Sequence, residues 1–252
     1  MIVVENIKKS FAQQSVLKGV SAEFYPGQCN LVIGTSGAGK TVFLKSLVGL
    51  HKPDSGNILY SDRKFNALKA KEQKSLRQEM GMLFQGNALF DSMTVEENIR
   101  FPLDMFTSKS EDEKRSRVTE CLQKVNLTGA GKKYPGEISG GMMKRVGIAR
   151  AIVMEPKYLF CDEPNSGLDP KTALVIDELI RELTIENNMT TVINTHDMNS
   201  VMGIGDKVTF LHKGLKHWEG SKNDILSSDN KELTDFIFAS DFLKQLRNKA
   251  NL

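Results

Sequence analysis

Short apolar runs separated by helical patterns recur along this chain. The N-terminal stretches IVVENIKKSF and VLKGVSAEFYPGQCNLVIG predict short strands, interrupted where Pro26 and Gly27 break the pattern. Further apolar runs at residues 31–33, 158–161 and 190–194 predict buried strands, and VTFLHKGLKHW predicts a hairpin. Strands that alternate with helices in this way predict an α/β fold with parallel strands in its core.

Helical periodicity divides the chain into a core and an insert. Apolar side chains recur at helical spacing in residues 41–50 and 173–187, next to the predicted buried strands. From about residue 85 the character changes, since the charged run EDEKRSR leads into another helical pattern. We therefore expect a mostly helical subdomain at residues 86–155, inserted into a core made of residues 1–85 and 156–227.

The C-terminal stretch, residues 228–252, predicts an amphipathic helical tail outside that core. Its apolar positions at helical spacing are Leu233, Phe236, Ile237, Phe238, Phe242, Leu243 and Leu246. Such a tail either docks on its own core or crosses to a partner subunit and strengthens a dimer. The pattern alone leaves both arrangements open.

Composition narrows the class of protein. Of the 252 residues, 40% are hydrophobic and 26% charged, with a net charge of +3, which gives no argument for nucleic acid or an anionic surface as a partner. The scattered cysteines Cys29, Cys121 and Cys161 predict reduced core thiols. We expect no signal-like N-terminus, and no apolar run approaches the roughly 20 residues that cross a bilayer.

A phosphate-binding loop is the most specific motif. The run GTSGAGKT at residues 34–41 fits GxxxxGK[ST] in full and lies between a predicted strand and a predicted helix. Glycines let the backbone approach phosphates, Lys40 should reach the β- and γ-phosphates, and the Thr41 hydroxyl should bind Mg²⁺. The expected phosphate-binding residues are Gly34, Ser36, Gly37, Gly39, Lys40 and Thr41.

Two acidic residues follow the predicted buried strand YLFC. Asp162 at the strand end is suited to hold Mg²⁺, and the adjoining Glu163 is suited to polarise the attacking water. Paired acidic residues often mark only a turn or a helix start. Their place behind four apolar strand residues favours a nucleotide-hydrolysing site.

The chain resembles the ATP-binding subunits of ABC transporters over nearly its whole length. The motifs that carry this resemblance, besides GTSGAGKT and YLFCDE, are MLFQG with Gln85, ISGGM with Ser139, Gly140 and Gly141, SGLD with Asp169, and NTHD with His196. The resemblance implies a P-loop NTPase core with an inserted helical signature subdomain and an N-terminal antiparallel β region. It also implies ATP and Mg²⁺ as cofactors.

The family's pattern assigns a role to each matching residue. Glu163 is expected to act as general base, His196 to contact the γ-phosphate, and Gln85 to bind Mg²⁺ and link the site to the helical insert. Asp169 is expected to act across a dimer interface. The family's signature motif, here ISGGM, departs from the usual pattern at Met142, where glutamine is usual. Because Ser139 and its glycines supply the main phosphate contacts, we expect ATP hydrolysis to survive.

The resemblance also explains why one chain carries two glycine loops. In this family two nucleotide domains pack head to tail, so that the Ser139 loop of one closes over the γ-phosphate held by the other. With one set of motifs, this chain is expected to form a homodimer that binds two ATP molecules. Phe11 in KKSFAQQSV occupies the position of the aromatic residue that stacks on adenine, although a lone phenylalanine is often a core residue.

The amino-acid sequences of three segments resemble those of the Mla-type phospholipid transporters. These are NALFDSMTVEENIRFPL, SGGMMKRVGIARA and DEPNSGLDP. The resemblance implies an integral-membrane permease and an MCE-type substrate-binding protein as partners, and a place on the cytoplasmic face of the inner membrane. Apolar residues Leu89, Phe90 and Met93 are expected to receive the permease. Alternatives are an amino-acid or lipoprotein transporter and a non-transporting ABC module of cell division; a nucleic-acid ATPase is disfavoured, because the basic residues form no stripe.

Overall fold

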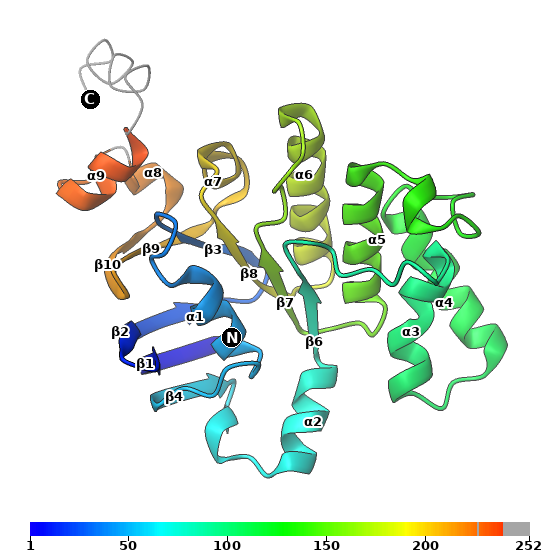
Figure 1. Ribbon diagram of the computed structural model, residues 1–252, viewed down its shortest axis with the longest axis horizontal. Helices are drawn as coiled ribbons and strands as arrows, with labels where there is room; N and C mark the ends of the chain where they lie inside the picture. Colours follow the sequence, from blue (N-terminus) through cyan, green and yellow to red (C-terminus); the bar gives the residue numbers. More distant parts are fainter. Residues whose placement is uncertain (226, 239–252) are drawn as a thin grey trace.

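The computed structural model describes residues 1–225 and 227–238, which form two β-sheets and the helices around them (Figure 1). The strands are β1 (Ile2–Phe11), β2 (Gln14–Phe24), β3 (Gln28–Ile33), β4 (Ser55–Tyr60), β5 (Arg63–Lys64), β6 (Met80–Leu83), β7 (Tyr158–Asp162), β8 (Thr190–Thr195), β9 (Lys207–His212) and β10 (Leu215–Gly220). The helices are α1 (Lys40–Leu47), α2 (Ala70–Gln78), α3 (Val95–Phe106), α4 (Glu111–Lys124), α5 (Gly140–Ile152), α6 (Pro170–Glu186), α7 (Met198–Ile204), α8 (Lys222–Ile225) and α9 (Lys231–Ile237), with 3₁₀ turns at Phe65–Ala67 and Pro135–Glu137.

The larger sheet sets the direction of the chemistry-bearing loops. Its strand order is β10-β9-β3-β8-β7-β6, and β3, β6, β7, β8 and β9 run parallel, while β10 returns antiparallel along β9. The register places Ile33 beside Thr195 and Asp162 beside Asn194. The carboxyl ends of β3, β7 and β8 therefore meet at one edge, where ligands bind in open α/β sheets.

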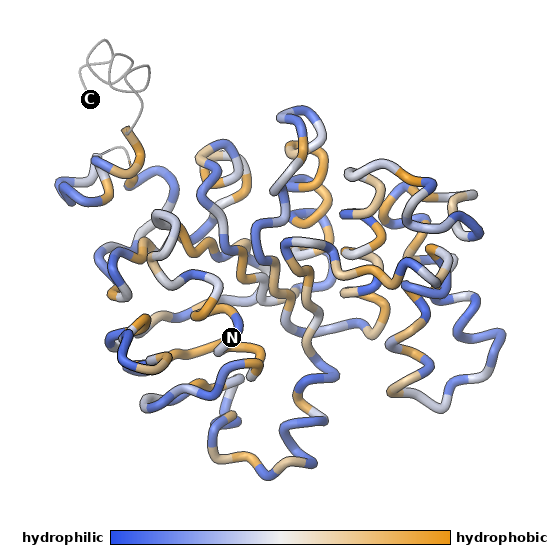
Figure 2. The backbone as a smooth tube through the Cα atoms, viewed as in Figure 1, coloured by the Kyte–Doolittle hydropathy of each residue, from blue (hydrophilic) through white to orange (hydrophobic). Residues whose placement is uncertain are grey.

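Two hydrophobic cores cover the two faces of this sheet. Val32 of β3 packs with α1 and the antiparallel sheet β2-β1-β4-β5, whereas Leu31 and Ile33 pack into the core shared with α3, α4, α5, α6 and α7. This alternation follows from the two-residue period of a strand. Figure 2 shows hydrophobic segments along the central strands and hydrophilic ones at the outer turns.

The α/β class and the antiparallel N-terminal sheet expected from the sequence are confirmed. Helix α1 ends at Leu47, three residues earlier than expected, because Gly49 adopts a φ of +77° that an α-helix does not contain. Helix α6 begins at Pro170 rather than 173, because Asp169 caps it by accepting a hydrogen bond from the Thr172 N–H. Helices α2 and α7 were not predicted.

Three helices, α3, α4 and α5, pack together at one end of the molecule, between β6 and β7 in sequence (Figure 1). They occupy the segment predicted as a helical insert. At the other end, Leu233, Ile237 and Phe238 in and beside α9 are buried in the core of their own chain. Phe242, Leu243 and Leu246 lie outside the described residues. Within residues 1–225 and 227–238, no helix is long and apolar enough to cross a membrane.

Candidate active site

The glycine loop between β3 and α1 needs its glycines for steric reasons. Gly34 and Gly39 adopt φ values of +150° and +103°. A Cβ on Gly34 would lie 2.2 Å from the carbonyl oxygen of Leu211, and one on Gly39 would lie 3.0 Å from Leu17 Cδ2. The loop is therefore pressed against β2 and β9 on one side, and its other side and the N-terminus of α1 face open space suited to an anion.

Lys40 holds a positive charge above this loop. Its Nζ donates hydrogen bonds to the carbonyl oxygens of Gly34 at 2.8 Å and Thr35 at 3.2 Å, and lies 3.9 Å from Glu163 Oε1. Burial lowers the pKa of Lys40, and the carboxylates of Glu163 and Asp162 oppose that shift. A cation in this position is placed to bind the phosphate groups of a nucleotide.

Asp162 ends β7 and gathers polar side chains from two neighbouring segments. Its Oδ1 accepts hydrogen bonds from Thr41 Oγ1 at 3.1 Å and from Asn194 Nδ2 at 3.2 Å, and the residue is almost completely buried. Asn194, in β8, was not predicted as a site residue. An amide side chain directly after the apolar pair Val192-Ile193 was the signal in the sequence that could have identified it.

Glu163 and His196 form a hydrogen-bonded pair at the same sheet edge. His196 Nδ1 lies 3.0 Å from Glu163 Oε1 and 2.9 Å from Oε2. Glu163 has a φ of +50°, an uncommon conformation for a side-chain-bearing residue, and its N–H donates to the Asn194 carbonyl at 3.0 Å. Only 12% of the Glu163 side chain is exposed, against 68% for His196. This is a partly desolvated carboxylate with a positioned partner, the arrangement that general-base chemistry uses.

A cavity of about 690 Å³ joins these groups. Its lining is Gln14, Val16, Thr35, Ser36, Gly37, Gly39, Lys40, Thr41, Val42, Gln85, Glu163, His196 and Phe236. The structure thus brings most of the residues predicted for the P-loop together with Glu163, His196 and Gln85. Gln14, Val16 and Phe236 were not predicted to face it.

The second glycine loop is not part of this cavity. Ser139 caps α5, its Oγ accepting a hydrogen bond from the Met142 N–H at 3.3 Å. A Cβ on Gly141 would lie 2.7 Å from Thr172 Cγ2, so the signature loop rests against the start of α6. Asp169, the cap of α6, also lies outside the cavity lining. Within the described chain, the signature loop and Asp169 do not share a pocket with the P-loop.

Phe11 ends β1 at the surface, with 42% of its area exposed. Its ring packs edge to face on His51, with a centroid separation of 5.2 Å, and Lys9 Nζ lies 5.3 Å from the ring centroid. Phe11 is not in the cavity lining, although its neighbours Gln14 and Val16 are. Its adenine-stacking role stays a prediction.

Oxygen donors at the site suit a hard cation. The Thr41 hydroxyl, the Asp162 carboxylate and the Gln85 amide are oxygen donors of the kind that Mg²⁺ prefers. Among the residues that the structure describes, no cluster of three or more His, Cys, Asp or Glu side chains is arranged for a metal ion. Mg²⁺ is commonly held by one or two carboxylates, water and substrate phosphates, so these residues fit a metal that arrives with a nucleotide.

Comparisons with known proteins agree with this geometry. A family model described as "ABC transporter" matches residues 17–166. "Probable ribonucleotide transport ATP-binding protein mkl" of Mycobacterium leprae (strain TN) is 40% identical over 236 residues, which cover 94% of this chain and 68% of that protein. "Methionine import ATP-binding protein MetN" of Campylobacter jejuni is 35% identical over 261 residues, which cover 97% of this chain and 78% of that protein. The chain spans about two thirds of the length of the mycobacterial relatives it matches.

Solved structures show the same fold. A dimeric structure of a bacterial ABC transporter cassette aligns with a TM-score of 0.81 and 31% identity, covering 88% of this chain and 99% of that one. A cassette in a dimeric post-hydrolysis state, bound to ADP and Pi, aligns with a TM-score of 0.80 and 30% identity. With its P-loop, paired acidic residues and signature loop on this fold, the chain belongs to the ABC transporter family and is an ATP-binding, ATP-hydrolysing cassette.

Proposed function

We propose that this cassette hydrolyses ATP as a head-to-tail homodimer and thereby drives a membrane permease. The proposal of a dimer rests on one observation: the cavity that contains Lys40 and Glu163 is not lined by Ser139, Gly140 or Gly141. A second copy turned head to tail supplies that loop from outside. The helical segment 86–155 acts in this proposal as the subdomain that presents it.

The side chains of the cavity divide the chemistry between them. Lys40 and the P-loop N–H groups bind the phosphates, and Glu163 accepts a proton from the attacking water. His196, held by Glu163 at 2.9 Å, orients toward the γ-phosphate. Thr41, Asp162 and Gln85 would hold Mg²⁺, which supplies charge neutralisation on the phosphates when bound.

A complementation experiment tests the head-to-tail arrangement. Lys40→Ala removes the phosphate-binding charge and Ser139→Arg blocks the signature loop, so each variant alone is expected to be inactive. If each site combines the P-loop of one chain with the signature loop of the other, a mixed dimer holds one site without either defect. Random assortment makes half of the dimers mixed, each with one intact site of two, so about a quarter of wild-type turnover should return.

The control for this experiment is a mixture of Lys40→Ala with Asp162→Ala. Both substitutions lie on the P-loop side of the site, and each site takes that side from a single chain. One site of a mixed dimer therefore carries Lys40→Ala and the other carries Asp162→Ala, so no turnover should return. Absence of turnover in the Lys40→Ala and Ser139→Arg mixture, with mixed dimers demonstrated by mass spectrometry, would refute the shared site.

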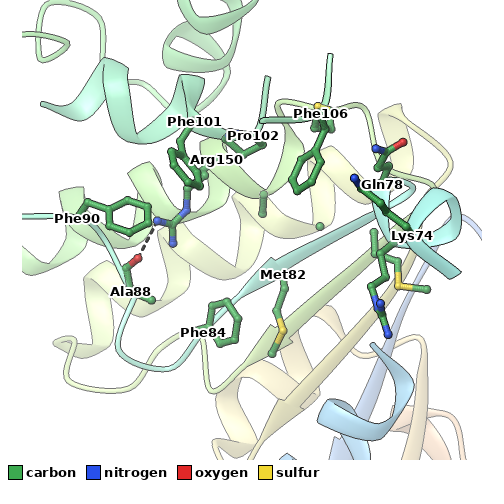
Figure 3. A pocket seen from close by; sticks show the side chains of 15 residues that line it. Lys74, Gln78, Met82, Phe84, Ala88, Phe90, Phe101, Pro102, Phe106 and Arg150 are labelled. Carbon is green, nitrogen blue, oxygen red and sulfur yellow. Dashed lines mark hydrogen bonds between the residues drawn. The ribbon is translucent and has the colours of Figure 1, made fainter. Parts of the chain in front are cut away.

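An apolar groove next to Gln85 provides the surface for the permease. Its volume is about 660 Å³, and it is lined by Met80, Met82, Phe84, Phe90, Phe101, Pro102, Phe106 and Met154, with Lys74, Arg77 and Arg150 among the polar residues (Figure 3). Phe90 remains 41% exposed and its ring packs on Phe101. Exposed aromatic side chains in a groove mark an interaction site. We assign to it a short helix from the permease.

The cargo proposed for this transporter is phospholipid, with an MCE-type binding protein as further partner at the inner membrane. The support is the resemblance of the segment NALFDSMTVEENIRFPL, which contributes Phe90 and Phe101 to the groove, to Mla-type ATPases. The names of the relatives favour two other cargoes, ribonucleotides and methionine.

An affinity experiment separates these cargoes. Glu163→Gln trapped with ATP is purified from detergent-solubilised membranes, and the bound proteins and lipids are identified by mass spectrometry. Recovery of a permease, an MCE-type protein and phospholipid supports the proposal. Recovery of a permease with an amino-acid or nucleotide-binding protein, or of cell-division proteins without lipid, would replace the cargo and leave the nucleotide chemistry intact.

A further inference from the structure

Two basic side chains of α5, the helix that begins at the signature glycines, donate hydrogen bonds to the loop that carries Gln85. Lys144 Nζ donates a hydrogen bond to the Gln85 carbonyl at 2.6 Å. Six residues further along α5, the Arg150 guanidinium donates to the carbonyls of Asn87 at 2.6 Å and Ala88 at 2.7 Å. The bond from Arg150 to Ala88 is drawn in Figure 3. Three carbonyl oxygens within four residues thus accept hydrogen bonds from one helix.

The charged side chain of Lys144 is almost completely buried. The residue is 2% exposed, and burial lowers its pKa, while the nearby Cys161 and Glu163 oppose that shift. A buried ammonium is unfavourable unless it is hydrogen-bonded. An apolar side chain would fill the same place without that cost. The contact with Gln85 is therefore the feature that explains a lysine at this position.

The loop that carries Gln85 has an uncommon backbone conformation. Asn87 and Ala88 have successive φ values of +61° and +49°, in the left-handed region that alanine rarely adopts. Such conformations persist where the surroundings hold them, and they cluster at functional sites. Here the carbonyl oxygens of both residues accept hydrogen bonds from Arg150, so α5 fixes the path of the loop.

Helix α5 also lies unusually close to the strand that leads into this loop. A Cβ on Gly147 would lie 2.7 Å from Leu83 Cδ1, so a larger residue there would require the Leu83 side chain to shift. Leu83 is the last residue of β6, two residues before Gln85. Close packing and three hydrogen bonds join α5 to the loop, and α5 begins at the signature glycines.

We propose that Lys144 is a positioning residue that ties Gln85 to the signature helix, so that a displacement of Ser139–Gly141 displaces Gln85 in the same chain. The inference rests on the proposed homodimer. In that dimer the signature loop contacts the nucleotide of the partner subunit, whereas Gln85 lies at the nucleotide of its own chain. Lys144 therefore connects the two nucleotide sites, and nucleotide bound at one of them sets the position of Gln85 at the other.

The test replaces Lys144 by methionine, which keeps the length of the side chain and removes the donor. Equilibrium binding of ATP should change less than about twofold, because no residue of the P-loop is altered. The kcat for ATP hydrolysis should fall about tenfold, because Gln85 is no longer held in place. Lys144→Arg, which retains a donor, should recover most of the kcat. Arg145→Met on the same helix is the control, since its guanidinium donates a hydrogen bond to the Asn126 carbonyl, outside this loop.

A double-mutant cycle distinguishes positioning from a general loss of structure. In a Gln85→Ala background the side chain that Lys144 positions is gone, so Lys144→Met should lower kcat less than about twofold further. A full additional loss in that background, or a wild-type kcat in Lys144→Met alone, would overturn the inference. If Lys144→Met does not fold, Lys144→Gln is measured in the same cycle. An inactive wild-type protein would instead count against the proposed function.

Discussion

Replacing Glu163 by glutamine removes one negative charge and leaves the shape of the side chain. The amide keeps a hydrogen-bonding partner for His196 but cannot accept a proton from water at neutral pH. A positioned general base contributes about 100- to 10,000-fold in rate. At 1.36 kcal/mol per factor of ten, the barrier to hydrolysis should rise by about 3 to 5 kcal/mol.

The same substitution should tighten ATP binding. Lys40 Nζ lies 3.9 Å from Glu163 Oε1, and at an effective dielectric constant of 20 their attraction has an upper limit of about 4 kcal/mol. ATP binding draws Lys40 toward phosphate and places phosphate charge beside the carboxylate, so both effects of Glu163 oppose binding. Solvent screening and the retained hydrogen bonds of Lys40 to Gly34 and Thr35 reduce the net gain to about 1 kcal/mol, or roughly fivefold in Kd.

Measurements of kcat and of the Kd for ATP test this prediction. Phosphate release gives kcat, and titration with a fluorescent ATP analogue in the presence of EDTA gives Kd without turnover. Glu178→Gln, which neutralises an exposed carboxylate of α6, is the matched control and should leave both values unchanged. A kcat within threefold of wild type would show that Glu163 is not the base. A weaker ATP affinity would refute the electrostatic reasoning about Lys40.

Three further predictions concern stability and reactivity. Tyr60→Phe removes the buried hydroxyl that donates to the Leu47 carbonyl at 2.7 Å and should cost about 1 kcal/mol, or 2–4 °C in Tm by calorimetry; an unchanged Tm would contradict this. Burial raises the pKa of Asp177, so above that pKa its negative charge destabilises the folded state. The gain in the free energy of unfolding from Asp177→Asn, measured by urea titration, should therefore be larger at pH 7.5 than at pH 4. A gain that shrinks as the pH rises would contradict this prediction. Burial raises the pKa of Cys29 to about 12 and of Cys121 to about 11, so iodoacetamide at pH 8 should label both only after denaturation, as mass spectrometry of intact protein would show.

Spacing in the sequence was sufficient to predict the phosphate loop and the acidic pair. The run from Gly34 to Thr41 matches the phosphate-loop pattern in full, and Asp162 ends a strand whose residues are all buried. Both are local features. The contact between Lys40 and Glu163 comes from parallel strands far apart in the chain, and no spacing in the sequence predicts it.

Other features left no periodic signal. Helix α2 has the sequence AKEQKSLRQ with Leu76 as its one buried residue, so no apolar stripe predicts it. Asn194 and Lys144 act through single hydrogen bonds to residues distant in sequence, and no spacing rule finds such contacts. For Phe11, position in the motif order favoured a place at the adenine, whereas its described contacts are with His51 and Lys9.

The register of the parallel sheet also governs when the enzyme can begin to work during folding. Strand β3 comes from the start of the chain, but its neighbours β8 and β9 come from its last third, and β7 is separated from β6 by the whole helical segment. Pairings between strands so far apart are slow to form, because the intervening loop must first be closed. The sequence of the P-loop is therefore made well before Asp162, Glu163 and His196, and ATP can stabilise only those molecules whose central sheet is complete.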